Sequence, residues 1–322
     1  MNKKISSFIV VSILLLVVII YSAITGSIKM EIAEFIRAIF GEDNSNYAVI
    51  KDLRFPRIIV AIFAGAGLSV AGVLLQAVMR NPLADAGVIG ISAGASFVQL
   101  LVITLFPMTF FFTPILAFFG GAFACFLVFM LSWKSGLNPL KIILVGIAIN
   151  AMFTGLTEAF VTLCSYMNIM VGGAGSSNLS MRTWSDVRLI SFYGVIGLLA
   201  SLLIASWCNL LALQDKTAKS LGFNVTRARL IIAAIAVLLA AISTATAGVI
   251  AFVGLLIPHI SRRLVGSDHK WLIPFSAIAG ALLILTADTL GRIVVAPLEV
   301  PASTIMAIIG GPFLIFLIRK DK

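Results

Sequence analysis

The segment Gly65-Ala66-Gly67-Leu68-Ser69-Val70-Ala71-Gly72-Val73-Leu74-Leu75-Gln76 is apolar and carries small residues at 65, 67, 69, 71 and 72. Small residues let a second helix backbone approach closely, which is how helices associate in lipid. Arg80-Asn81-Pro82-Leu83-Ala84-Asp85 follows, and Asn81-Pro82 breaks the helix. A second apolar segment starts at Gly87, so the sequence predicts two membrane spans joined by a tight elbow at the membrane surface.

The composition is that of a membrane protein. The 322 residues are 61% hydrophobic and only 11% charged, with a mean hydropathy of +1.13. A soluble domain cannot bury so much apolar surface, so we predict an all-α polytopic membrane protein. The net charge of +10 reflects Lys and Arg in cytoplasmic loops rather than nucleic-acid binding, because no basic face with interleaved aromatic residues is present.

About ten spans are predicted, forming a single transmembrane domain over residues 1–322. Their approximate ranges are 8–26, 57–79, 87–106, 110–132, 140–164, 187–212, 229–249, 250–264, 271–291 and 302–318. The first resembles a signal peptide, but no clear cleavage site follows it, which favours an uncleaved span. An even number of spans places both termini on one side. That side then carries 15 of the 23 Lys and Arg residues, so both termini are predicted to be cytoplasmic.

Two segments outside the spans have a helical pattern. Residues 28–40 alternate apolar and charged faces at helical spacing, which predicts an external helix lying in the membrane interface. Residues 213–229 form the longest polar insertion on the inner side. Asp215 is expected to cap a short helix there, Gly222 to end it and Asn224 to cap the next helix. Such an element suits contact with a cytoplasmic partner; the alternative is a plain solvated loop.

No catalytic arrangement is convincing, and we expect a protein that is not an enzyme and that binds no metal or cofactor. No Gly-x-x-x-x-Gly-Lys-Ser/Thr motif occurs, so nucleotide binding by that route is excluded. Residues 90–94 spell Gly-x-Ser-x-Gly, and with His259 could suggest a serine hydrolase, but we expect Ser92 to pack within a small-residue helix. Glu158 and Asp288 are the carboxylates nearest to the membrane interior, and they keep open a proton-coupled secondary transporter.

Charged residues gather at the predicted outer ends of spans. Arg54 and Arg57 precede or begin the second span, three residues apart, and Asp288, Arg292 and Glu299 lie near the last two. Such a rim suits either charge-complementary docking of a partner or simple interfacial anchoring, with Asp288 and Arg292 pairing four residues apart. Residue types alone do not separate the two.

Taken in order, these motifs resemble the iron-chelate and cobalamin import permeases, the membrane subunits of type II ABC importers. The resemblance extends over nearly the whole chain. It rests on Arg54-Phe55-Pro56-Arg57, Gln76, Arg80 to Ala84, Leu221-Gly222, Ala251 to His259, Ala287-Asp288, Arg292, Leu298 to Pro301 and Gly310-Gly311-Pro312.

The resemblance implies partners and residue roles. It implies a second copy of the permease or a paralogue, two separate ATPase subunits that hold ATP and Mg²⁺, and an extracytoplasmic substrate-binding protein. Arg54, Arg57 and Arg292 would dock the binding protein, and Glu158 would line the pathway. Asp215, Lys216, Lys219, Leu221 and Gly222 would couple to the ATPase. The cytoplasmic gate would comprise Asn81, Pro82, Leu83, Pro139 and Leu140, although relatives often have Ser or Thr where Pro139-Leu140 stand here.

The cargo is inferred from resemblance alone. Residues 179–187 look like haem permeases of Gram-positive bacteria, which places haem ahead of ferric siderophores, with cobalamin third. We therefore expect a multi-pass permease in the plasma membrane of a bacterium, within an ATP-driven importer. The alternative from another class is the proton-coupled transporter that uses Glu158 and Asp288.

Overall fold

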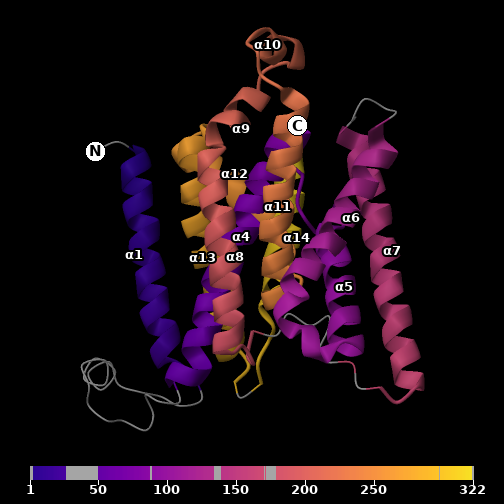
Figure 1. The fold of residues 1–322 in the computed structure, drawn as a ribbon. Coiled ribbons are helices and arrows are strands. Elements are labelled where there is room, and N and C mark those ends of the chain that lie inside the picture. The colour runs from indigo at the N-terminus through magenta and orange to yellow at the C-terminus, as the bar shows by residue number, and fades with distance from the viewer. Residues whose placement is uncertain are drawn as a thin grey trace.

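The structure is a computed structural model, and it describes residues 3–26, 50–87, 89–133, 139–169, 171, 179–296 and 298–320. Within these ranges the chain is a bundle of helices without strands (Figure 1). The longer helices are α1 (Lys3–Ile24), α4 (Phe55–Met79), α5 (Ile91–Leu105), α6 (Thr113–Trp133), α7 (Pro139–Tyr166), α8 (Trp184–Leu203), α11 (Val225–Ala247), α12 (Val253–Val265), α13 (His269–Ile293) and α14 (Ala302–Lys320). The shorter elements are η1 (Ile50–Arg54), η2 (Pro107–Phe112), α9 (Ala205–Leu211) and α10 (Asp215–Ser220).

The all-helical membrane fold is confirmed, and every predicted span contains a helix. Seven helices of the described part are long and apolar enough to cross a membrane, and α5 and most of α14 form shorter apolar helices. At 13 residues, α12 covers only about 20 Å, which is too short for a complete crossing. The count of ten crossings and the cytoplasmic location of the termini stay predictions. The start of α1 and the end of α14 do lie at the same end of the bundle as α10 (Figure 1).

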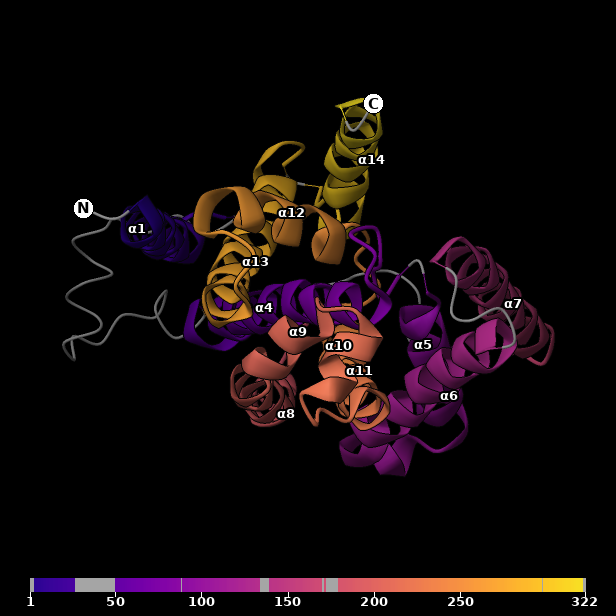
Figure 2. The same cartoon turned by 90° about the horizontal axis from the view of Figure 1, so that it is seen from above.

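Helix α4 is the centre of the bundle, and α8, α11, α12 and α13 surround it (Figure 2). The predicted close packing of its small residues is confirmed. A Cβ atom added at Gly65 would lie 2.2 Å from the carbonyl oxygen of Gly280 in α13. One added at Gly72 would lie 2.2 Å from the carbonyl oxygen of Gly254 in α12. Only glycine permits backbones this close, so these contacts fix where α12 and α13 cross α4.

Several helix ends differ from the prediction because turn residues intervene. Helix α4 ends at Met79, and Arg80, which caps it, is left-handed with φ 49°. Helix α5 starts only at Ile91, so the described residues between the two helices form a loop instead of the expected tight elbow. Gly90 is also left-handed. Ser92 is buried in the first turn of α5, which confirms that it packs within a helix. The predicted span 187–212 is divided at Ile204 into α8 and α9. The external helix predicted at 28–40 lies outside the described residues.

Candidate functional site

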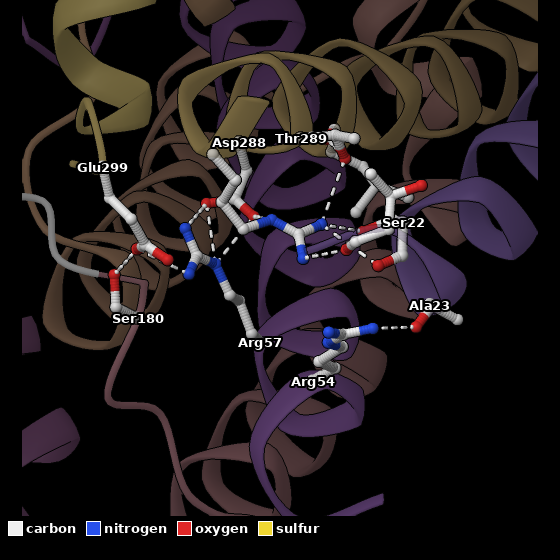
Figure 3. A network of polar contacts seen from close by, with 11 residues as sticks. Ser22, Ala23, Arg54, Arg57, Ser180, Asp288, Thr289 and Glu299 are labelled. Atoms are coloured by element: carbon white, nitrogen blue, oxygen red, sulfur yellow. Dashed lines mark hydrogen bonds and ion pairs between the residues drawn. The ribbon is translucent and has the colours of Figure 1, made fainter. Parts of the chain in front are cut away.

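Three regions of the molecule carry the residues singled out by the sequence: an arginine cluster at one end, helix α10 at the other, and a cavity beside residues 81–83. The arginine cluster lies where α1 ends, α4 begins and α13 ends (Figure 3). Pro56 occupies the first turn of α4, where its missing N–H costs nothing. This start places Arg57 beside the last turns of α13, which carry Asp288 and Arg292.

Arg57 is held by two carboxylates. Its Nε and Nη2 donate to Oδ2 and Oδ1 of Asp288 at 2.8 and 2.9 Å, a bidentate geometry that fixes both side chains. Its Nη1 donates to Glu299 Oε2 at 2.8 Å, and Ser180 donates to the same oxygen. Desolvation alone would raise the pKa of Glu299, but the bonds from Ser180 and Arg57 outweigh it and hold that pKa below its usual value.

The other two arginines, Arg54 and Arg292, donate hydrogen bonds to carbonyls at the C-terminal end of α1. Arg54 Nη1 donates to the carbonyl of Ala23 at 2.7 Å. Arg292 donates to the carbonyls of Ser22 and Thr25, both at 3.2 Å. These are carbonyls at a helix C-terminus, which lack intrahelical partners and carry partial negative charge. The guanidinium groups therefore join α1 to α4 and α13.

The structure thus brings Arg54, Arg57 and Arg292 together, but it buries them. Their exposed fractions are 9%, 7% and 8%, and the predicted pairing of Asp288 with Arg292 is present at 3.7 Å. The side chain most open to solvent in this cluster is Glu299, at 42%. Docking of a binding protein by these arginines stays a prediction. Their burial and their bonds show a structural role, which the residue types alone could not distinguish from docking.

Helix α10 projects from the opposite end of the bundle (Figure 1). Gly222, with φ +77°, ends it in a Schellman motif: Phe223 N–H donates to Ala218 O at 3.1 Å, and Gly222 N–H to Lys219 O at 2.9 Å. The expected cap of the next helix is confirmed, since Asn224 Oδ1 accepts from Arg227 N–H at 3.0 Å. Lys216, Lys219, Leu221 and Gly222 are all exposed, as contact with a partner would require.

Asp215 does not have the capping role expected from the sequence. The residue before α10 is Gln214, and Asp215 is the first helical residue. Its carboxylate instead forms ion pairs with Arg80 at 2.6 Å and with Arg229 at 3.1 Å. The sequence did not predict that Arg80 would pair with Asp215, because these two residues are far apart in the chain.

Arg80 joins α10 to the loop predicted to be a gate. Besides binding Asp215, its guanidinium donates to the carbonyl of Leu211 at 2.7 Å and to that of Leu213. The residues that follow it directly are Asn81, Pro82 and Leu83, where Asn81 Oδ1 accepts from Leu83 N–H at 2.9 Å and closes a tight turn. One side chain therefore connects α10 to the residue that directly precedes this turn.

The turn lines one wall of a cavity of about 250 Å³, whose other walls come from α12 and α14 and the residue before α12. Phe252, Leu255, His259 and Phe313 lie in these walls. Phe252 is left-handed with φ 69°, and it packs against Gly310 of α14. A bulky apolar surface next to the turn fits a constriction that excludes water.

The remaining predicted residues lie apart from this cavity. Pro139 and Leu140 begin α7, but their side chains fall outside the described part of the chain, so their gate role stays a prediction. Glu158 lies on α7 and is exposed. Asp288 is fixed by Arg57 and Arg292, which disfavours its use as a mobile proton carrier.

Comparison with known proteins finds relatives that match nearly the whole chain. The FecCD transport family matches residues 14–320. The chain is 40% identical over 321 residues to the "Probable heme-iron transport system permease protein IsdF" of Staphylococcus aureus strain MSSA476, covering 100% of this chain and 98% of the relative. It is 39% identical to the protein of the same name in strain Newman, with the same coverage.

Two solved structures share the fold. One is described as an inward-facing conformation of a metal-chelate type ABC transporter; it is 27% identical, with a TM-score of 0.80, and the match covers 98% of this chain and 99% of that one. The other is PsaBC from Streptococcus pneumoniae in complex with a Fab, with a TM-score of 0.58 and 18% identity over 89% and 95% of the two chains. At that identity the second match concerns the fold alone.

Proposed function

The chain belongs to the FecCD transport family, and from this premise we propose that it is the permease of an importer for an iron complex, with haem as the first cargo to test. The chain is an ABC transporter permease, a transport subunit in the membrane. The haem assignment is supported by the relative at 40% identity, whose name refers to heme-iron transport. Ferric siderophores come second and cobalamin third.

In this proposal the permease pairs with a second copy or a paralogue, and the pathway runs between the two. Two ATPase subunits bind at the end that carries α10, and a substrate-binding protein delivers cargo at the end that carries the arginine cluster. ATP and Mg²⁺ are held by the ATPase subunits. The permease itself makes and breaks no covalent bonds in the cargo.

The observation that carries the mechanism is the Arg80 contact between α10 and the turn at 81–83. ATP binding draws the ATPase subunits together and displaces α10, with Leu221, Gly222, Lys216 and Lys219 as the exposed contact surface. The Asp215–Arg80 pair transmits the displacement to the turn. The bundle then shifts between outward-facing and inward-facing packings, as in other two-state transporters.

The test is haem uptake into proteoliposomes that contain the permease, its ATPase and the loaded binding protein. We expect uptake to require ATP and to be lost when residues 216–222 are scrambled. Unimpaired uptake by the scrambled variant would contradict ATP coupling through α10. Uptake driven by a pH gradient without the ATPase would favour the secondary transporter instead.

A further inference from the structure

A second cavity lies at the α10 end of the bundle, separate from the one beside the gate turn (residues 81–83). Its volume is about 320 Å³, within the range of small-molecule sites. Helices α4, α9, α12 and α13 supply most of its walls. Among the residues that the structure describes, its polar lining residues are Gln76, Arg80, Asn209, Arg262, Ser267 and His269, and none of these carries a carboxylate.

Arg262 gives this cavity a positive charge that no acidic residue of its described lining compensates. The residue is half-buried, and within the described part of the chain its guanidinium forms no ion pair and no side-chain hydrogen bond. The other arginine of the lining, Arg80, is occupied by Leu211, Leu213 and Asp215. A partly desolvated charge without a counter-ion is unfavourable, and a guanidinium presents a planar fork suited to phosphate oxygens.

Two of the residues that line the cavity carry a hydrogen-bond acceptor without a partner. Asn209 Nδ2 donates to Asp268 at 2.7 Å, which fixes its Oδ1 as the acceptor that lies 2.7 Å from His269 Nδ1. Nδ1 of His269 therefore carries the proton, and Nε2 of the neutral ring is an acceptor. Gln76 Nε2 donates to Gly254 O at 2.9 Å. Within the described residues, His269 Nε2 and Gln76 Oε1 are buried and have no partner.

We propose that this cavity is a binding site for a phosphate group that also carries hydroxyl hydrogens. The phosphate oxygens accept from Arg262, and the hydroxyl hydrogens supply donors for the acceptors of Gln76 and His269. Two sources share this chemistry: inorganic phosphate, which is partly protonated at neutral pH, and the headgroup of phosphatidylglycerol, which has two hydroxyls. Sulfate and phosphatidylcholine provide the anionic oxygens but no hydroxyl donor.

The first arm titrates sodium phosphate and sodium sulfate into the purified full-length chain at pH 7 and measures heat. We expect phosphate to bind more tightly than sulfate. Arg262→Gln should weaken phosphate binding about ten- to a hundredfold, as removal of a charge-assisted bond does. The matched control is Arg263→Gln, because Arg263 is the next residue in α12 and is exposed; its affinity should stay within about twofold of the wild type. If Arg262→Gln does not fold, Arg262→Lys keeps the charge without the fork and should bind with intermediate affinity.

The second arm measures lipid retention by native mass spectrometry after reconstitution with phosphatidylglycerol or phosphatidylcholine. If the wild type retains phosphatidylglycerol and Arg262→Gln does not, the lipid headgroup is the ligand of the site. If the wild type binds phosphate but retains no phosphatidylglycerol, the ligand is the free anion. Equal behaviour of the wild type and Arg262→Gln in both arms would overturn the proposal. Equal binding of sulfate and phosphate would also overturn it. So would weaker binding of the ATPase subunit by Arg262→Gln if neither phosphate nor phosphatidylglycerol binds to the wild type.

Discussion

Replacement of Asp215 by asparagine removes the carboxylate that joins α10 to Arg80 and Arg229. The side chains of Arg80 and Asp215 are 35% and 41% exposed, so solvent screens the pair. Exposed ion pairs contribute about 0.2–1 kcal/mol, and the two contacts to Asp215 place this one near ~1 kcal/mol. The folded state should therefore survive the change. If the same free energy links α10 to the gate turn, loss of this pair should lower the amount of haem transported per ATP hydrolysed about fivefold.

The assay is the amount of haem transported per ATP hydrolysed in proteoliposomes with the ATPase and the loaded binding protein. Asp215→Asn and Arg80→Gln should each lower this ratio about fivefold, with ATP hydrolysis retained. The double variant should lose no more than either single one, because both remove the same contact. Arg263→Gln, an exposed charge at the same end of the bundle, serves as the control. Additive losses, or an unchanged ratio in the single variants, would refute transmission through Arg80.

Three further predictions concern the stability of the permease. Gly65→Ala should lower the melting temperature, because its Cβ would lie 2.2 Å from a backbone oxygen of α13 and overpacking costs about 1–3 kcal/mol; Gly311→Ala, where a Cβ meets nothing within 4 Å, should not. Arg57→Gln should lower the free energy of unfolding by about 3–5 kcal/mol, because the buried Asp288 would keep only its 3.7 Å contact with Arg292. The exposed Lys51→Gln should be neutral, and an equal loss for both variants would contradict the role of burial. The bonds from Ser180 and Arg57 lower the pKa of Glu299. They therefore stabilise the folded state above the usual pKa of Glu, and this stabilisation is lost as the pH falls through the lowered pKa. The unfolding curves of the wild type and Glu299→Gln should differ at neutral pH and converge in acid.

Much of the fold followed from the sequence because it depends on local patterns. Apolar length located the helices, and the small residues of 65–72 predicted close packing, which Gly65 and Gly72 confirm. The Schellman ending at Gly222 was likewise predictable, since a left-handed position there favours glycine. Each of these inferences uses residues that are close in the chain.

What the sequence could not provide are contacts between distant residues. The pairing of Arg80 with Asp215 joins positions 135 apart, and the bonds from Arg292 to the end of α1 span 270. Burial of Arg54 and Arg57 was equally invisible, because their charge and position suit a surface as well as a helix end. A signal was available for Arg80 alone: it directly precedes Asn81-Pro82, at a helix end.

The most direct test of the central claim is haem accumulation by liposomes that contain this polypeptide with and without its ATPase. Coupling through α10 predicts uphill accumulation only when the ATPase, ATP and the loaded binding protein are all present. Accumulation against a gradient by the polypeptide alone would contradict it.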